Sequence, residues 1–235
     1  MRGDVAVLVP AAGLGTRLGP GGPKALREVS GSSLLLHAVQ RLLRAPSVAA
    51  VVVAAPIGRS VEVARSLHGL STVPVHVVDG GATRQESVAA ALRAVPGDYP
   101  IILVHDAARA FAPPDLTERV AAAERAGHDA VIPVLPVVDT VKQVDAEGYV
   151  TGTPDRASLR AVQTPQGFSR AVLEQAHAAG SGDASDDAVL VERLGVRVFC
   201  VPGEQAALKI TRPADLALAE ALALGSPATP TTLAP

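Results

Sequence analysis

Short apolar runs alternate with segments of helical periodicity along most of the chain, and this alternation constrains the fold more than any other feature. The first run, Val5–Pro10, has no charged residue, as expected of a strand that is buried on both faces of a sheet. Because parallel strands need helical crossovers, the pattern predicts an α/β protein. We expect a Rossmann-like three-layer sandwich with a mostly parallel central sheet.

The predicted elements fill one domain over residues 1–225. Besides the first strand, we expect strands at residues 48–54, 73–78, 100–104, 130–134 and 196–201. We expect helices at residues 34–43, 61–70, 85–95, 170–179, 186–194 and 213–224, and one opened by Pro113 and Pro114. A length of 235 residues with 48% hydrophobic residues suits one large aliphatic core. Residues 226–235, rich in Pro, Thr and Ala, are predicted to be a disordered tail.

One polar segment, residues 139–156, interrupts the alternation. It holds Glu147-Gly148 between two short strand-like runs, which predicts a protruding β-hairpin arm. The arm has little apolar material to bury against its own body. It is therefore a candidate for packing on a second subunit as a homodimer, and a floppy surface excursion is the equal alternative.

Composition argues against several classes of function. The net charge of −2 provides no basic field for nucleic acid. No apolar run approaches the roughly 20 residues that span a bilayer, and no signal segment is recognisable, so we expect a cytoplasmic protein without a membrane partner. Cys200 is the only cysteine, which excludes an internal disulfide. We expect it to be an inert thiol inside a buried strand.

The strongest local signal is the Gly-rich loop that follows the first strand. Gly13 and Gly15 would let the backbone approach a phosphate chain, and Arg17 and Lys24 would neutralise its charge. The alternative is a tight strand–helix turn. A dinucleotide-binding fingerprint fits poorly, because the third glycine is displaced to position 19 and the second strand ends without an acid.

Two further loops follow predicted strands and should meet at the same edge of the sheet. In the first, Gly80 and Gly81 would let a base lie against the backbone, and Ser87 would bond its polar edge. In the second, Asp106 is suited to hold Mg²⁺ and Arg109 to face an anion. For His105 we favour a structural role over that of a general base.

These motifs, in their order and spacing, resemble the methylerythritol-phosphate cytidylyltransferase family from about residue 5 to residue 224. The motifs that carry the resemblance are Ala11-Ala12-Gly13, Arg17, Pro23-Lys24, Asp79-Gly80-Gly81, Arg84, Ser87, His105-Asp106-Ala107-Ala108-Arg109, Asp139-Thr140, Asp155-Arg156, Thr164-Pro165-Gln166 and the run from Lys209 to Leu216. No single motif is specific, but the set is.

The resemblance implies CMP transfer from CTP to 2-C-methyl-D-erythritol 4-phosphate, with Mg²⁺ as cofactor. It implies that Arg17, Lys24 and Lys209 are catalytic. The nucleotide would be bound by Ala11, Ala12, Gly13, Gly15, Gly80, Gly81, Ser87 and Ala107. Asp106 would position the metal, and the second substrate would contact Asp106, Arg109, Thr140, Arg156 and Thr164. The arm would reach a partner subunit, so that Thr140 and Arg156 complete the partner's site.

Some features depart from the pattern or leave rivals open. The family often has an acid where this chain has Ala82, and Pro where it has Ala110. Ribitol-5-phosphate cytidylyltransferases share much of the pattern, and hexose-1-phosphate nucleotidylyltransferases share the first loop. A dinucleotide oxidoreductase and a non-catalytic nucleotide-binding protein are the alternatives of other classes.

Overall fold

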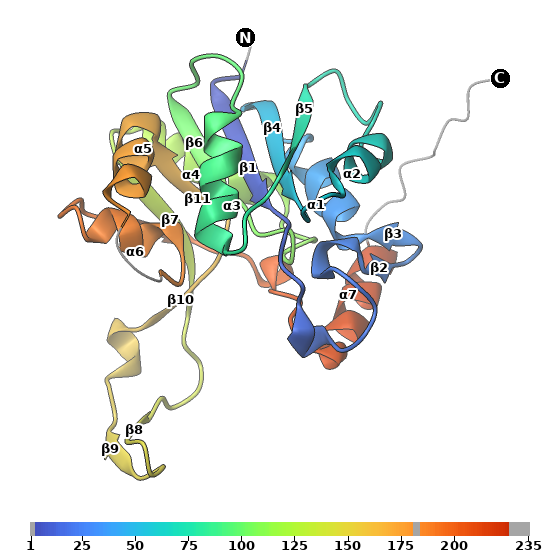
Figure 1. Ribbon diagram of the computed structural model, residues 1–235. Coiled ribbons are helices and arrows are strands. Elements are labelled where there is room, and N and C mark those ends of the chain that lie inside the picture. Colours follow the sequence, from blue (N-terminus) through green and yellow to red (C-terminus); the bar gives the residue numbers. More distant parts are fainter. Residues whose placement is uncertain (1–2, 181–183, 226–235) are drawn as a thin grey trace.

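A mixed β-sheet forms the centre of the computed structural model, which describes residues 3–180 and 184–225 (Figure 1). Within these residues the main sheet has eight strands, in the order β10-β7-β11-β6-β1-β4-β5, with β12 also paired to β7. The strands are β1 Val5–Pro10, β4 Val48–Ala55, β5 Val75–Asp79, β6 Ile101–Val104, β7 Ala130–Pro136, β10 Arg160–Val162, β11 Gln166–Ser169 and β12 Phe199–Pro202. The short β2 Glu28–Val29 and β3 Ser32–Ser33 pair separately.

The first half of the sheet is parallel, as predicted. β1 pairs in parallel with both β4 and β6, and β4 pairs in parallel with β5. β11 is the exception in the middle, because it runs antiparallel to both β6 and β7. The mostly parallel sheet is therefore confirmed, whereas β10 and β11 were not expected from the sequence.

Helices cover both faces of the sheet and complete the three layers. They are α1 Leu34–Leu42, α2 Ser60–Ser66, α3 Arg84–Arg93, α4 Pro114–Arg125, α5 Arg170–Ala179, α6 Asp187–Glu192 and α7 Pro213–Gly225. Alternate residues of β1 enter opposite cores: Val7 packs in the cluster that includes residues of α1 and α4, and Leu8 in the cluster that includes residues of α3 and α5. This two-sided burial explains why β1 is apolar throughout.

A smaller apolar cluster joins the Gly-rich loop to the C-terminal part of the domain. It contains Leu18 of the loop, Phe111 after β6, Ile210 and Ala219 of α7, all buried. This packing fixes residue 209 close to the loops that follow β1 and β6, although the three segments are far apart in the sequence.

The predicted arm is present and projects from the body of the domain (Figure 1). Its strands, β8 Gln143–Val144 and β9 Val150–Gly152, pair only with each other among the described residues. Large apolar side chains are exposed on it, among them Tyr149 at 74% and Val150 at 59% exposure. The arm thus carries an apolar surface that its own subunit leaves open.

Some details differ from the expectation. Cys200 is exposed, not buried, because β12 pairs only with β7 and leaves its neighbour Phe199 44% exposed. Helix α2 ends at Ser66, four residues earlier than predicted. The predicted disordered tail lies outside the described residues. No helix in residues 3–180 and 184–225 is long and apolar enough to cross a membrane.

Candidate active site

A pocket lies where three strands of the sheet end. Its walls come from the loops after β1, β5 and β6 and from the segment before α7. The lining residues are Pro10, Ala11, Ala12, Gly13, Lys24, Ala25, Gly81, Ala82, Thr83, Arg84, Ser87, Asp106, Ala107, Ala108 and Lys209. The motifs predicted to meet at one edge of the sheet therefore do so. This is the edge at which open α/β sheets bind ligands.

The backbone of the Gly-rich loop fixes the position of Lys24. Gly15 has a φ of +65°, and the carbonyl of Gly13 accepts a hydrogen bond from the Lys24 N–H at 3.2 Å. A Cβ atom at Gly15 would lie only 2.3 Å from Cβ of Lys24. Arg17 is exposed and lies in the 3₁₀ turn η1 Thr16–Leu18, outside the lining residues described for the pocket.

The loop after β5 is equally crowded. A Cβ atom at Gly80 would lie 2.7 Å from Cβ of Ala12 and 2.9 Å from Oγ of Ser87, so only glycine fits between them. The Ser87 hydroxyl accepts from the Gly81 N–H at 3.1 Å and donates to the Thr83 carbonyl at 2.9 Å. Ser87 therefore lines the pocket but also fixes the shape of the loop.

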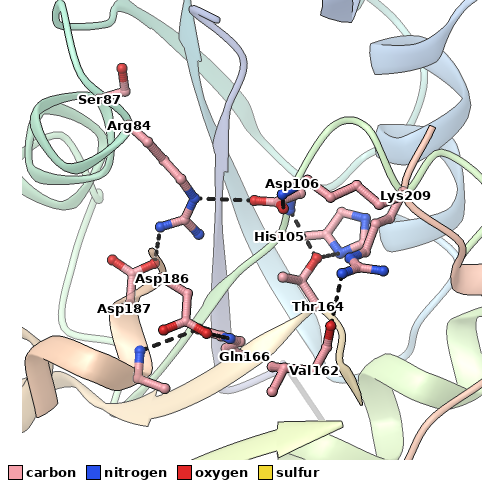
Figure 2. Close-up of polar contacts among 12 residues, drawn as sticks. Arg84, Ser87, His105, Asp106, Val162, Thr164, Gln166, Asp186, Asp187 and Lys209 are labelled. Atoms are coloured by element: carbon pink, nitrogen blue, oxygen red, sulfur yellow. Dashed lines mark hydrogen bonds and ion pairs between the residues drawn. The ribbon is translucent and has the colours of Figure 1, made fainter. Parts of the chain in front are cut away.

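The loop after β6 places a buried carboxylate between two cations (Figure 2). Oδ1 of Asp106 lies 3.2 Å from Nε of Arg84, and Oδ2 lies 2.8 Å from Nζ of Lys209. Burial by itself would raise the pKa of Asp106, but the charges of Arg84 and Lys209 hold it well below its usual range. The two cations thus favour the ionised form of Asp106 within the pocket.

Lys24 has the opposite perturbation. Desolvation, followed by repulsion from Lys209, lowers the pKa of Lys24 to about 8, although Asp106 opposes the shift. A negatively charged ligand in the pocket would reverse this effect, because it would favour the ammonium form. The pocket is therefore electrostatically prepared for an anion.

His105 is buried and bonded to the protein. Its Nδ1 atom lies 3.2 Å from Oγ1 of Thr164, which also accepts the Asp106 N–H at 3.0 Å. Burial lowers the pKa of His105 to about 4, so the ring is neutral at pH 7. This environment favours the structural role expected for His105. Thr164 lies beside Asp106 but outside the pocket lining.

Arg109 is buried and bonded to two backbone carbonyls. Its guanidinium donates to the carbonyl oxygens of Ala207 at 2.7 Å and Val162 at 2.9 Å. Burial lowers its pKa, and its Nε has no hydrogen-bond partner among the described residues. Arg109 therefore braces the segments that lead to Lys209 and the arm.

The two predicted site residues of the arm are not among the residues that line this pocket in their own chain. Thr140 is exposed, and Arg156 donates to the Val138 carbonyl at 2.6 Å. Their position leaves them available to a neighbouring molecule.

Three polar side chains connected to the site have no role predicted from the sequence. They are Arg84, the first residue of α3, Asp187, the first residue of α6, and His177 of α5. The guanidinium–carboxylate contact between Arg84 and Asp187 joins positions 103 residues apart, so no local spacing reveals it. A signal was present at Arg84, which follows the Gly80-Gly81 pair in a predicted ligand loop.

The donor set of the pocket limits the kind of metal that it can hold. Asp106 is the only carboxylate among the lining residues, and the described residues contain no group of three metal-ligating side chains. Mg²⁺ commonly takes one or two carboxylates and completes its shell with substrate phosphates and water. An ionised Asp106 beside a phosphate-binding loop fits such an ion, but not a metal held by protein ligands alone.

Comparisons with known proteins agree with this geometry. The IspD model, described as 2-C-methyl-D-erythritol 4-phosphate cytidylyltransferase, matches residues 5–224. The enzyme of that name from Frankia casuarinae is 56% identical over 93% of this chain and 80% of its own length. The one from Rhodococcus opacus is 54% identical over 94% and 96%.

Solved structures give the same result. The crystal structure of the Thermus thermophilus enzyme is 43% identical, with a TM-score of 0.75 over 93% of this chain and 98% of that chain. The Anaerococcus prevotii synthase has a TM-score of 0.82 at 26% identity, over 95% and 100%. Because the family model spans nearly all of the domain and its relatives match along most of their length, the chain belongs to the 2-C-methyl-D-erythritol 4-phosphate cytidylyltransferase family.

Proposed function

We propose how this chain carries out the reaction that its family membership assigns to it, CMP transfer from CTP to 2-C-methyl-D-erythritol 4-phosphate. A phosphate oxygen of the alcohol phosphate attacks the α-phosphorus of CTP. The bond from that phosphorus to the bridging oxygen breaks, and pyrophosphate leaves with the electron pair. The convergence of Lys24, Lys209 and Asp106 on one pocket is the observation that carries this proposal.

The nucleophile needs no general base. The second pKa of a phosphate monoester is about 6, so the attacking group is mostly ionised at pH 7. The buried, neutral His105 supports this interpretation, because it is bonded to Thr164 and does not line the pocket. Catalysis then depends on holding two anions in line and neutralising their charge.

Three cations share that task in our proposal. Lys24 binds the triphosphate from the Gly-rich loop, and Lys209 contacts the reacting phosphates from the opposite wall. Arg17, on the exposed rim of the loop, adds charge at the outer phosphates. Cations fixed where negative charge develops stabilise the transition state more than the ground state.

We assign Asp106 to the divalent cation. When bound, Mg²⁺ would withdraw charge from the phosphate oxygens. Arg84 and Lys209 keep the carboxylate of Asp106 ionised, so it would hold the ion together with the substrate phosphates.

Backbone groups provide most of the nucleotide contacts in this proposal. Ala11, Ala12, Gly13, Gly15, Gly80, Gly81 and Ala107 present main-chain atoms to CTP, and Ser87 bonds the base. Ala82 stands at a position that is often acidic in the family, and its N–H is already bonded to Oε2 of Glu86 at 2.7 Å. The ribose contact here would therefore come from neighbouring backbone.

The second substrate would be bound between two subunits of a homodimer. Arg109 and Thr164 belong to the same chain as the pocket, whereas Thr140 and Arg156 would come from the partner's arm. The exposed apolar side chains of the arm, such as Val144 at 59%, support this assembly. Arg109 would have to release a backbone carbonyl to bind phosphate. We place the enzyme in the cytoplasm, where CTP is available.

The test is pyrophosphate release from CTP and Mg²⁺ with either methylerythritol phosphate or ribitol phosphate, with other nucleoside triphosphates as controls. We expect release with CTP and methylerythritol phosphate. Release with ribitol phosphate alone would keep the chemistry and overturn the substrate. No release with either alcohol phosphate would overturn the proposed mechanism.

A further inference from the structure

A chain of charged groups leads from the pocket into the protein behind it (Figure 2). Arg84 contacts Asp106 through Nε at 3.2 Å and contacts Oδ2 of Asp187 through Nη1 at 2.7 Å. The second oxygen of Asp187, Oδ1, lies 3.0 Å from Nε2 of His177. One guanidinium therefore bridges the pocket carboxylate and a second carboxylate that has no access to the pocket.

The second carboxylate is held in a single position. The Asp187 side chain is 1% exposed and that of His177 is 5% exposed. A buried carboxylate is costly unless it is paired, and here each oxygen has one partner. Asp187 therefore cannot rotate without leaving a buried charge uncompensated, and it fixes the direction of the Arg84 fork.

The position of that fork matters to Asp106. Arg84 donates only one N–H to Asp106, at 3.2 Å, which is longer than its 2.7 Å contact with Asp187. The Nη2 atom of Arg84 has no hydrogen-bond partner among the described residues. If Asp187 lost its charge, Asp106 would be the only carboxylate left to Arg84. A guanidinium prefers two parallel bonds to a carboxylate, so it would turn onto Asp106.

We propose that Asp187 is a positioning residue, which holds Arg84 away from a two-point contact and so leaves Oδ2 of Asp106 open to Lys209 and to the metal. His177 supports it by occupying the other oxygen of Asp187. This inference rests on the proposed role of Asp106 in the reaction. It goes beyond that role, because Asp187 and His177 touch neither the pocket nor a substrate.

The decisive variant is Asp187→Asn, with Asp186→Asn as its matched control. Asp186 is the N-cap of the same helix and accepts the Val189 N–H at 3.1 Å, and Asn caps a helix about as well as Asp. For D187N we expect kcat to fall about 10- to 100-fold, as when an outer partner of a metal ligand is lost. The KM for methylerythritol phosphate should stay within about twofold, because Asp187 makes no contact that binds this substrate in the ground state. D186N should keep the wild-type kcat.

A binding measurement separates positioning from general damage. Calorimetric CTP affinity is measured with EDTA and with Mg²⁺ for wild type and both variants. For D187N we expect an unchanged affinity in EDTA and a loss of the gain that Mg²⁺ gives. A purely structural role for Asp187 would weaken binding in both conditions alike, and that result would overturn the proposal.

The crystal structure of D187N provides a readout that does not depend on turnover. We expect two Arg84–Asp106 contacts in place of one. An unchanged Arg84 would sink the proposal even if activity were lost. If wild type itself released no pyrophosphate, the function assignment would fail, but this structural comparison would still decide the role of Asp187.

A second variant covers failure of D187N to fold. Arg84→Lys keeps the charge but has no planar fork, so it cannot make the two-point contact that would close Oδ2 of Asp106. R84K should therefore keep the gain in CTP affinity that Mg²⁺ gives, and in an R84K background D187N should cause no further fall in kcat. Loss of that gain in R84K, or additive losses in the double variant, would contradict the proposal.

Discussion

A side chain on Gly15 and the present position of Lys24 exclude each other, because a Cβ atom at Gly15 would lie 2.3 Å from Cβ of Lys24. The loop thus needs glycine at this position for the sake of another residue. Gly22 in the same loop also has a positive φ, of +84°, but a Cβ atom there would meet nothing within 4 Å. Substitution of Gly15 would therefore displace Lys24 and strain the backbone, whereas substitution of Gly22 would only strain the backbone.

Gly15→Ala is expected to lower kcat/KM for CTP about 100-fold, because a misplaced catalytic group loses its alignment. Gly22→Ala carries a similar strain of about 1–2 kcal/mol and should lower only stability. Steady-state kinetics and thermal unfolding of both variants check this. Equal kinetic losses in the two variants would show that backbone strain, and not the position of Lys24, controls activity.

The lowered pKa of Lys24 predicts a pH effect. Its pKa of about 8 belongs to the empty pocket, so kcat/KM for CTP should fall as the pH rises through about 8 and Lys24 loses its proton. In the complex, the triphosphate favours the ammonium form, so the fall in kcat should come at higher pH. Lys24→Arg should have a lower kcat/KM without this fall near pH 8. A flat wild-type profile from about pH 7 to pH 9.5 would refute the assignment.

Replacement of a lysine in the pocket should lower kcat, whereas replacement of the lysine outside the pocket should not. The chain has only three lysines, and Lys142 lies on the arm, where its Nζ is 2.7 Å from Oγ1 of Thr153. Lys209→Ala should lower kcat by about 100-fold or more, because a cation at the reacting phosphates is lost. Lys142→Ala should keep kcat. Turnover assays with matched circular dichroism spectra decide the matter.

A buried acid outside the site gives a stability prediction. Burial, followed by repulsion from Asp129, raises the pKa of Glu124 to about 8, and its Oε1 has no hydrogen-bond partner among the described residues. The folded state therefore binds a proton that the unfolded state releases above pH 4.5. The stability gained from this proton is complete below that pH and is lost as the pH rises through about 8.

Urea unfolding between pH 5 and pH 8.5 tests this linkage. The free energy of unfolding should fall by up to about 1.4 kcal/mol per pH unit from this group. Glu124→Gln should remove that slope, whereas Glu174→Gln, at a side chain that is 50% exposed, should not. A Glu124→Gln protein with the wild-type slope would contradict the raised pKa.

The sequence predicted the parallel strands β1, β4 and β6 well because each is apolar and buried on both faces. In β1 and β4 almost every residue is buried, and their short length and Val-rich composition favour a strand over a buried helix. β11 was missed, since Gln166-Gly167-Phe168-Ser169 has no strand-like alternation. It is a strand because β6 and β7 pair with both of its edges, which is a tertiary effect.

The site was predictable in its loops but not in its long-range contacts. Gly-rich turns and a carboxylate after a strand are local signals, so the sequence singled out Lys24, Ser87 and Asp106, which line one pocket. The exposed Cys200 was mispredicted, because an apolar run does not reveal whether its strand lies at an edge. The Arg84–Asp187 contact joins two helices 103 residues apart, and only the fold brings them together.

The proposed exchange of arms between subunits makes a prediction that no single-subunit model shares. If Arg156 acts in the partner's pocket, a protomer with Arg156→Ala should still have a competent pocket of its own. A protomer with Lys209→Ala has an inactive pocket but an intact arm. A heterodimer of the two therefore contains one complete site, built from the Lys209 of one chain and the Arg156 of the other.

Mixing the two inactive variants under conditions of subunit exchange should restore about a quarter of wild-type activity, because half of the dimers are mixed and each has one working site. Differently tagged variants, purified through both tags, should raise this to about one half. Purified mixed dimers that stay as inactive as their parents would mean that Arg156 acts in its own chain. Recovery requires the arm to cross, because no exchange of intact pockets could produce it.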